Sequence, residues 1–293
     1  MAITLTQIRA FLAVKATGSV QAAADQLLVS QPSVSAAVTS LGRELGTALF
    51  ERHGRGVRLT GSGEAFAPYA AEVLGLLEQG RFAAQEAAHP ESSRIRLIAV
   101  NTAGEFLVPP LIRAYRKLHP GISILLEVGN RATVLERLRS RRADIGIGGR
   151  PPGRGLAGYP FLANELVVVG REIPADLART PWLLREEGSG TRLATERLLA
   201  DLDLGSPELL TLGSNGAIKQ CLAVGLGVSL ISRFAVAREL RDGLLTEIGV
   251  PGTPLSRPWH VLFPQSGPQR PAVRVFGEYL RSGQACQIIE DCL

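Results

Sequence analysis

The sequence has little cysteine, and the cysteines lack the spacing of a covalent or metal-bound framework. They are Cys221, Cys286 and Cys292, an odd number without a CxxC pair. Disulfide scaffolds and zinc modules need paired or closely spaced cysteines, so both classes are excluded. We therefore expect no metal site, and this cysteine content suits a reducing compartment.

The sequence also lacks long hydrophobic runs. Its longest apolar stretch, Cys221–Ile231, contains two glycines and a serine and is shorter than the ~20 residues that span a membrane. The N-terminus carries Arg9 and opens no uninterrupted apolar run, so it does not resemble a signal peptide. These absences predict a cytoplasmic protein without a membrane partner.

Histidine is scarce, and no catalytic set can be recognised. The histidines are His53, His89, His119 and His260, and none neighbours a G-x-S-x-G turn. The G-x-G that begins at Gly225 lacks the third glycine and the acidic residue of a dinucleotide-binding motif. We therefore expect a protein that is not an enzyme and that has no cofactor.

What is present is a globular composition with an uneven distribution of charge. The 293 residues are 45% hydrophobic and 20% charged, a length that suits about two domains. The net charge is +5; residues 1–60 hold six Lys or Arg against three Asp or Glu, and residues 61–90 hold one against four. The chain thus has a basic head, an acidic spacer and a weakly basic body, which favours a polyanionic partner.

The basic head predicts a helix-turn-helix. Apolar residues recur at helical spacing over residues 4–17, and Gly18 ends that helix. Ser19 and Ser30 can cap two further helices, the second with a proline in its first turn and Gly46 at its end. The second helix of such a pair enters the DNA major groove with its N-terminal side chains. The alternative is an ordinary helical hairpin with a solvated polar face.

The segment LFERHGRGVRLT, which follows these helices, reads as two short β segments around a glycine-containing tip. Arg52, Arg55 and Arg58 lie around that tip. A basic hairpin beside a helix-turn-helix is a wing that can reach phosphates or the minor groove. A solvated basic loop is the alternative interpretation.

Residues 5–63 resemble the winged helix-turn-helix of LysR-type transcriptional regulators. The alanine pair and the SQPSVS, L-G-x-x-LG, LF-x-R and LT-x-x-G elements occur in order. The resemblance implies a DNA-binding domain of residues 1–60, double-stranded promoter DNA as its partner, and RNA polymerase as a further partner. The predicted DNA contacts are Gln31, Pro32, Ser33, Ser35, Thr39, Arg43, Arg52 and Arg55.

Residues 61–90 predict a long linker helix followed by a hinge. Thr60 can cap the helix, and apolar residues recur every three or four positions from Phe66 to Ala84. The apolar side of so long a helix needs a cover, either its own body domain or a second copy. The resemblance implies the second copy, in an antiparallel pair of linker helices, and hence a homodimer or homotetramer. The hinge is expected at residues 89–93.

From residue 91 the pattern changes to alternating strands and helices, which is typical of a parallel α/β sheet. We expect strands at RIRLIAV, ISILLEVGN and ADIGIGG, separated by helices near 104–118 and 131–142. A second unit is expected from ELVVVG to PWHVLFP.

The predicted fold class is therefore α/β: a winged helix-turn-helix, a long linker helix, and a two-lobed effector domain over residues 91–293. Lobe I would comprise about 91–161 and 266–293, and lobe II about 162–265. The resemblance to the same regulators covers this region too, and implies an effector-binding domain similar to periplasmic binding proteins.

Polar residues at several strand ends predict the effector site. Open α/β sheets bind ligands at the carboxyl ends of their strands. Helix starts with small polar residues favour anions, and an added arginine favours carboxylate or phosphate. Each such residue alone can be a helix cap and nothing more. The predicted effector contacts are Asn101, Thr102, Asn130, Arg131, Arg150, Glu187, Ser189, Thr191, Arg192, Ser214 and Asn215.

The segments VGNRATV, DIGIGGRPP, REEGSGTR and GSNGAIKQCLAVGLGVSLISRFAV resemble the subgroup that controls Calvin-cycle (RuBisCO) operons. The resemblance implies a small anionic effector, either a phosphorylated sugar metabolite or NADPH. Regulators of sulfur metabolism that sense sulfite or sulfate share SGTR and GSN-x-x-IK and are the alternative. A redox sensor that uses Cys221 is a further alternative, although a cysteine inside a helix is more simply a small hydrophobic residue.

Overall fold

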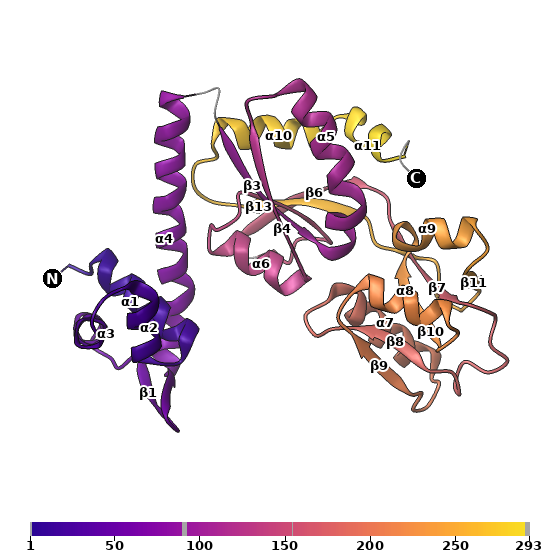
Figure 1. The fold of residues 1–293 in the computed structure, drawn as a ribbon, viewed down its shortest axis with the longest axis horizontal. Helices are drawn as coiled ribbons and strands as arrows, with labels where there is room; N and C mark the ends of the chain where they lie inside the picture. The colour runs from indigo at the N-terminus through magenta and orange to yellow at the C-terminus, as the bar shows by residue number, and fades with distance from the viewer. Residues whose placement is uncertain (1, 90–92, 154, 291–293) are drawn as a thin grey trace. The chain divides into compact units, whose positions relative to one another are not determined.

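The computed structural model describes residues 2–89, 93–153 and 155–290, which fold into two compact units (Figure 1). Unit 1 comprises Met1–Ala84 together with Arg139–Arg142, and unit 2 comprises Gln85–Leu138 and Ala143–Leu293. Within the described ranges, no helix is both long and apolar enough to cross a membrane.

Unit 1 begins with the helix-turn-helix that the sequence predicts. Its helices are α1 (Leu5–Thr17), α2 (Val20–Leu27) and α3 (Gln31–Leu45). The hydroxyls of Ser19 and Ser30 accept hydrogen bonds from backbone N–H groups in the first turns of α2 and α3, at 3.3 and 3.4 Å. Small buried side chains let these helices approach closely; they include Ala10, Ala13, Ala23, Ala24 and Val34.

The predicted wing is the hairpin of β1 (Phe50–His53) and β2 (Gly56–Leu59). The Val57 N–H donates to the Gly18 carbonyl at 2.9 Å, which attaches the hairpin to the turn between α1 and α2. Only glycine fits at Gly56, because a Cβ there would lie 2.5 Å from the carbonyl oxygen of Gly18. The wing is therefore held against the helices by a close backbone contact.

The long helix α4 (Gly61–Ala88) matches the predicted linker helix, and the Thr60 hydroxyl caps it by accepting from the Gly63 N–H at 3.1 Å. Its apolar stripe divides in two. Phe66 and Ala70 pack into the core of the head, whereas Tyr69, Val73, Leu76 and Leu77 are exposed. Only the second part is thus open to a partner. Residues 90–92 of the predicted hinge lie outside the described residues.

Unit 2 consists of two lobes, each a sheet with helices on both faces. The sheet of lobe I has the order β4-β3-β5-β13-β6. Its strands are β3 (Arg94–Val100), β4 (Ser123–Gly129), β5 (Ile145–Gly148), β6 (Leu156–Leu162) and β13 (Trp259–Pro264). One face carries α5 (Val108–Leu118), α10 (Pro271–Arg281) and α11 (Gly283–Glu290), and the other carries α6 (Arg131–Arg139) (Figure 1).

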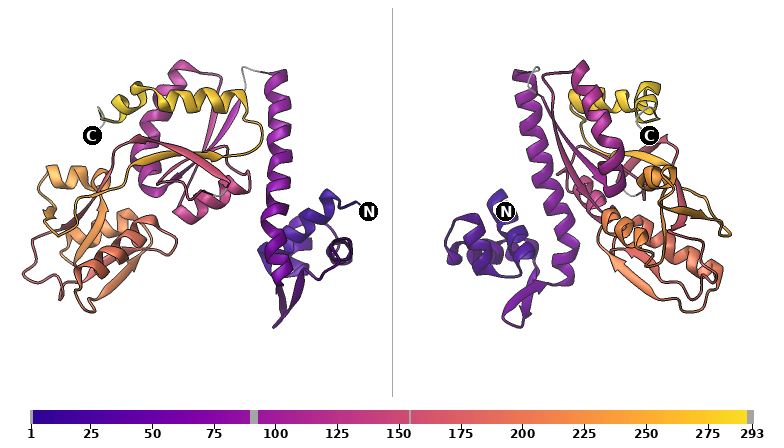
Figure 2. Two further views of the ribbon diagram at one scale, coloured as in Figure 1. Left: turned by 180° about the vertical axis from the view of Figure 1, so that it is seen from behind. Right: turned by 45° about the vertical axis from the view of Figure 1, so that its right-hand side comes forward.

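The sheet of lobe II has the order β11-β7-β10-β8-β9, with β12 also paired to β7. Figure 2 shows this lobe, coloured from pink to orange, in two further views. Its strands are β7 (Glu165–Gly170), β8 (Trp182–Arg185), β9 (Leu209–Leu212), β10 (Val228–Ser232), β11 (Thr246–Ile248) and β12 (Leu255–Ser256). The helix α7 (Gly190–Leu202) covers one face, while α8 (Asn215–Ala223) and α9 (Arg233–Arg241) cover the other.

The predicted boundary between the lobes is wrong where the chain returns from lobe II to lobe I. The expectation placed PWHVLFP in lobe II, but β13 lies between β5 and β6 in lobe I and runs antiparallel to both. The sheets are accordingly mixed and not parallel. The physical reason is that the chain returns from lobe II in the opposite direction and inserts between existing strands, a pairing that local periodicity does not encode.

Several elements differ from the sequence prediction in their ends. The helix expected over 131–142 ends at Arg139, because Arg141 adopts a left-handed backbone with φ of 57°. The helix expected from residue 104 instead begins with a π-helical turn, Ala103–Leu107, that runs into α5. Such turns are frequent at functional sites. The strand β6 and the helix α9 were not expected.

The last turn of α4 belongs to unit 2, where a buried charge network holds it. The Glu86 carboxylate accepts from the Arg270 guanidinium at 3.0 Å and from the Ala272 N–H at 2.7 Å. Arg270 also donates to Asp144 at 2.7 Å, and Asp144 accepts from Arg96 at 2.7 Å. The side chains of Glu86, Arg270 and Asp144 are 7%, 5% and 2% exposed. Glu86 therefore depends on Arg270 for its compensation, whereas Asp144 is shared between Arg270 and Arg96.

We predict that Arg270→Met destabilises unit 2 by about 3–5 kcal/mol, because it leaves the buried carboxylate of Glu86 without its cation and removes one of the two arginines that pair with Asp144. Chemical denaturation of the full chain measures this. Arg274→Met is the matched control, since Arg274 is exposed on α10, the helix that begins directly after Arg270, and its loss should cost no more than about 0.5 kcal/mol. Equal stability of the two variants would contradict the role assigned to Arg270.

Candidate functional site

The first candidate surface is the start of α3 in unit 1. The predicted DNA contacts of this helix all have exposed side chains: Gln31, Pro32, Ser33, Ser35, Thr39 and Arg43. Val34 and Leu41, on the opposite side, are 1% and 0% exposed and anchor the helix in the core. Small polar side chains on an exposed, capped helix start are what a recognition helix presents to base edges.

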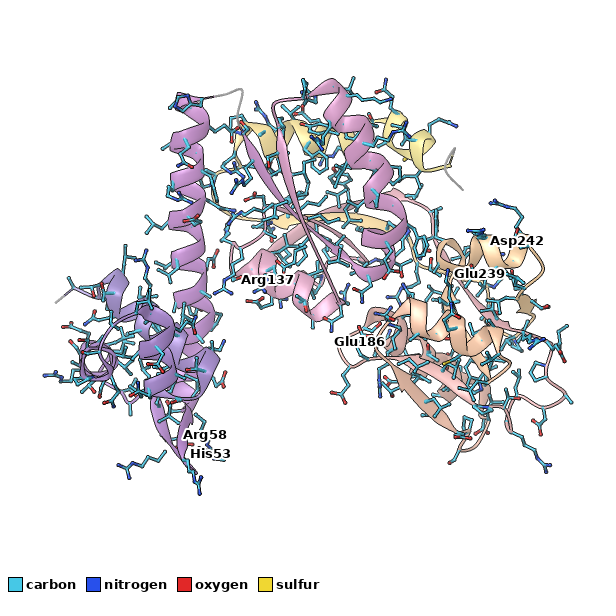
Figure 3. The ribbon with its side chains drawn as sticks, viewed as in Figure 1. His53, Arg58, Arg137, Glu186, Glu239 and Asp242 are labelled. Carbon is cyan, nitrogen blue, oxygen red and sulfur yellow. The ribbon has the colours of Figure 1, made fainter. Side chains whose placement is uncertain are left out.

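The second part of this surface is the wing, where Figure 3 labels His53 and Arg58. The Arg58 guanidinium pairs with Glu51 across the hairpin at 2.7 Å, so much of its charge is compensated. Arg52 and Arg55 are exposed and pair with no carboxylate among the described residues. These two arginines are therefore the side chains of the wing best suited to meet phosphates.

The other candidate site is a cleft in unit 2 at which strands of both lobes end. Residues at the carboxyl ends of β3, β4 and β5 meet residues at the carboxyl ends of β8 and β10 there, and water can occupy about 60 Å³ of the space. The lining residues are Val100, Asn101, Thr102, Asn130, Arg131, Gly149, Asn164, Leu166, Arg185, Ser189, Gly190, Thr191, Ser232, Arg257 and Trp259.

The cleft brings together six of the predicted effector contacts. They are Asn101, Thr102, Asn130, Arg131, Ser189 and Thr191. Segments that lie far apart in the sequence thus meet, as expected for the strand ends of two facing α/β sheets. Whether these residues touch an effector stays a prediction.

A buried arginine joins the two lobes beside this cleft. Arg185, 4% exposed, donates to both oxygens of the Glu186 carboxylate at 2.8 and 2.9 Å and to the Asn215 side-chain oxygen at 2.7 Å. With its amide turned to satisfy its neighbours, Asn101 of lobe I also accepts from Arg185. The Asn215 amide extends this hydrogen-bond network into lobe I, because it donates to the Thr102 hydroxyl at 3.0 Å. Glu186 therefore compensates the charge of Arg185 within lobe II, while Asn101 of lobe I accepts one of its hydrogen bonds.

Asn130 makes a second connection between the lobes. Its side-chain oxygen caps α6 by accepting from the Thr133 N–H at 2.9 Å, and its amide donates to the Glu187 carbonyl of lobe II at 3.1 Å. The Ala132 N–H donates to the Gly188 carbonyl at 3.3 Å. Asn130 is thus a cap and an inter-lobe contact at once.

The remaining predicted effector residues do not line the cleft. The Arg192 guanidinium pairs with Glu196 at 2.8 Å and donates to the Arg185 carbonyl at 3.1 Å. Arg192 lines a neighbouring hollow, which Glu187 also lines. Arg150 contributes its carbonyl to Arg131, and Ser214 caps α8. Asn215 is 2% exposed and acts through Thr102 and Arg185. The position of a polar residue at a helix start does not by itself distinguish a helix cap or an internal hydrogen bond from a contact with a ligand.

Sequence reasoning missed four polar residues of the cleft: Asn164, Arg185, Ser232 and Arg257. Arg185 and Ser232 carried a usable signal, because each is the last residue of a strand that ends at the cleft. Arg257 and Asn164 lie where the chain crosses between the lobes, and no local pattern marks those crossings. The Arg257 N–H donates to the Asn164 carbonyl at 2.8 Å, which joins the two crossings directly.

The cleft is electropositive. Arg131, Arg185 and Arg257 line it, and among its described lining residues there is no carboxylate. Burial, and then the charges of Arg131 and Arg197, lower the pKa of Arg257 from its ordinary value. Among the described residues no cluster of His, Cys, Asp or Glu could hold a metal ion. The arrangement suits the binding of a small anion.

Both regions match models of known protein families. Residues 5–64 match "Bacterial regulatory helix-turn-helix protein, lysR family", and residues 88–285 match "LysR substrate binding domain". Together these matches cover the head and nearly all of unit 2.

The chain is similar to known regulators over most of its length. It is 33% identical over 288 residues to the transcriptional activator CmpR of Synechocystis, covering 94% of both chains. It is 33% identical over 295 residues to the RuBisCO operon transcriptional regulator of Acidithiobacillus ferrooxidans, covering 96% of this chain and 94% of that one. The solved regulatory domain of Synechocystis CcmR in complex with 2-PG is 32% identical, with a TM-score of 0.59, over 64% of this chain and 95% of that one.

We predict that Arg52→Ala and Arg55→Ala each reduce the slope of log affinity against log salt for duplex DNA by about 0.9, the loss of one phosphate contact. Fluorescence anisotropy over a salt series measures it. Arg58→Ala is the matched control: it should change the slope less, because Glu51 already compensates Arg58. Equal slopes in the wild type and all three variants would show that the wing does not contact phosphates.

Proposed function

The chain belongs to the LysR family of bacterial transcriptional regulators, and from that premise we propose that it controls carbon-fixation genes in response to a small phosphorylated metabolite. The family membership makes it a DNA-binding regulator and not an enzyme. The proposal adds which genes it controls and what it senses.

The observation that carries the effector assignment is the charge of the cleft. Arginines line it, and among the described lining residues no carboxylate does. The α7 helix begins there at Ser189–Gly190, and backbone N–H groups at a helix start add further donors for an anion. Arginines and backbone N–H groups can bind the phosphoryl group of a phosphate ester such as phosphoglycolate. They can equally bind a sugar bisphosphate or the phosphates of NADPH.

The similarity to a RuBisCO operon regulator supports the choice of pathway. CmpR and the RuBisCO operon regulator are both 33% identical to this chain over nearly its full length. The regulatory domain of CcmR, 32% identical, was solved with 2-PG bound. We carry that ligand class over to the cleft of unit 2 as part of the proposal.

We further propose that the chain works in the cytoplasm as a homodimer or homotetramer on promoter DNA. The exposed apolar residues of α4 supply a face for a second copy, and they include Tyr69, Val73 and Leu77. An effector that prefers one arrangement of the lobes would shift the assembly, and with it the DNA bend and the recruitment of RNA polymerase.

The redox alternative receives no support from the geometry. Cys221 is half-buried and packs against the core of lobe II, and the thiol of Cys286 donates to the Phe161 carbonyl at 2.9 Å. Cys292 lies outside the described residues. The sulfur-metabolism alternative stands as an outcome of the following test.

We predict saturable binding of a phosphorylated metabolite to the full chain in calorimetric titrations. The panel is phosphoglycolate, ribulose 1,5-bisphosphate, NADPH, sulfite and sulfate. Binding of sulfite or sulfate alone would move the assignment to sulfur metabolism. Binding of none of the five would contradict the proposed effector class.

A variant pair locates the binding site. Thr102→Val removes a hydroxyl that lines the cleft while it keeps the side-chain volume, and it should weaken phosphoglycolate binding about three- to tenfold. Arg192→Ala should leave the affinity within about twofold, because Arg192 pairs with Glu196 outside the cleft. The reverse order of effects would place the ligand at the neighbouring hollow.

A further inference from the structure

Arg257 lies where the chain returns from lobe II to lobe I, and its backbone is held from both sides. Its N–H donates to the Asn164 carbonyl at 2.8 Å, and its carbonyl accepts from the Asn164 amide at 2.9 Å. Asn164 also accepts from the buried Ser232 hydroxyl at 2.6 Å. These bonds fix the Arg257 backbone at the junction of the lobes, while its side chain lines the cleft.

The Arg257 guanidinium lies close to that of Arg131. A Cβ added at Gly149 would be 3.4 Å from Arg131 Nη1 and 3.9 Å from Arg257 Nη2. A Cβ added at Gly190 would be 3.6 Å from Arg257 Nη2 and 3.5 Å from Arg131 Cδ. The two cations therefore face one space, bordered by a glycine of lobe I and a glycine of lobe II.

Arg257 differs from Arg185, another arginine of the cleft. Arg185 has its own carboxylate, Glu186, and two amide oxygens. Arg257 has no carboxylate partner among the described residues, and the Arg131 guanidinium, which donates to the Arg150 carbonyl at 3.0 Å, faces the same space. Like charges this close repel each other, so the space between them favours an anion.

A buried donor at the same cleft also lacks an acceptor. Trp259, two residues after Arg257, lines the cleft and is 6% exposed. Among the described residues its indole N–H has no hydrogen-bond partner. A buried N–H without an acceptor is rare and costly, which indicates that a ligand supplies the acceptor.

We propose that Arg257 is a specificity-determining residue, which acts with Arg131 to select a doubly charged oxyanion over a singly charged one. The inference rests on the proposed function of the cleft as the effector site, and it narrows the ligand to phosphate monoesters and comparable dianions. A phosphate monoester carries nearly two negative charges above its second pKa of about 6. Each guanidinium can donate two parallel hydrogen bonds to its oxygens. The phosphoryl group of a phosphodiester carries one charge and therefore meets the two guanidiniums with one charge fewer.

The test compares phosphoglycolate with its methyl phosphodiester, by calorimetric titration of the full chain at pH 7.5. Both probes keep the carboxylate, so they differ by one charge on the phosphoryl group and by the methyl group. The wild type should bind phosphoglycolate at least about tenfold more tightly than the diester, because the loss of one charge-assisted hydrogen bond weakens binding by about that factor. Arg257→Gln should weaken phosphoglycolate binding by about the same factor and leave the diester nearly unchanged, so that the preference disappears. Arg257→Lys keeps the charge but loses the planar guanidinium that donates two parallel hydrogen bonds, so it should give an intermediate preference.

Arg192→Gln is the matched control, since it removes a nearby arginine that pairs with Glu196, and it should keep the full preference. Thermal unfolding of each variant should match the wild type, because the backbone bonds of Arg257 are retained. An unchanged preference in Arg257→Gln, or an equal loss for both probes, would overturn the role of Arg257 and leave the proposed function standing. If the wild type bound neither probe, the proposed effector class would fail as well.

Discussion

The arrangement of unit 2 depends on one buried cation, the guanidinium of Arg185. A guanidinium that is 4% exposed would cost several kcal/mol without compensation. Its partners come from both lobes: Asn101 from lobe I, and Glu186 and Asn215 from lobe II. Separating the lobes at this point would remove the hydrogen bonds of Arg185 to Asn101 and of Asn215 to Thr102, so the network favours the arrangement in which the strand ends of both sheets face each other.

This network also determines which charges remain for a ligand. Glu186 compensates Arg185, and Asn215 reaches across to Thr102. The other two arginines that line the open space are Arg131, at the start of α6, and Arg257, at the crossing between the lobes. We therefore propose that Arg185 holds the lobes together, whereas Arg131 and Arg257 receive an anion. An anion between the last two would touch lobe I and the crossing together, which links binding to the position of the lobes.

The sequence predicts the parts of this molecule that local chemistry determines. Ser19, Ser30 and Thr60 cap the helices that they were expected to cap, and Gly18 and Gly46 end α1 and α3. These features succeed because a cap involves residues only three or four positions apart. Polar residues after β3 and β4 meet at the cleft because parallel strands end at the same edge of a sheet.

The parts that depend on tertiary pairing could not be predicted in this way. The insertion of β13 between β5 and β6 joins strands about a hundred residues apart, and nothing in its own alternation reveals its neighbours. Arg257 follows no strand-end pattern, since its role comes from a crossing whose place depends on that insertion. Arg192 had the right spacing from Ser189, yet Glu196, one helical turn later, draws its guanidinium away from the cleft.

The most direct test of this account is the crystal structure of the full chain with phosphoglycolate bound. The account predicts a phosphoryl group within hydrogen-bond distance of both Arg131 and Arg257, with the Arg185–Glu186 pair intact. A phosphoryl group bound at Arg192 in the neighbouring hollow, or one that displaces Glu186 from Arg185, would contradict it.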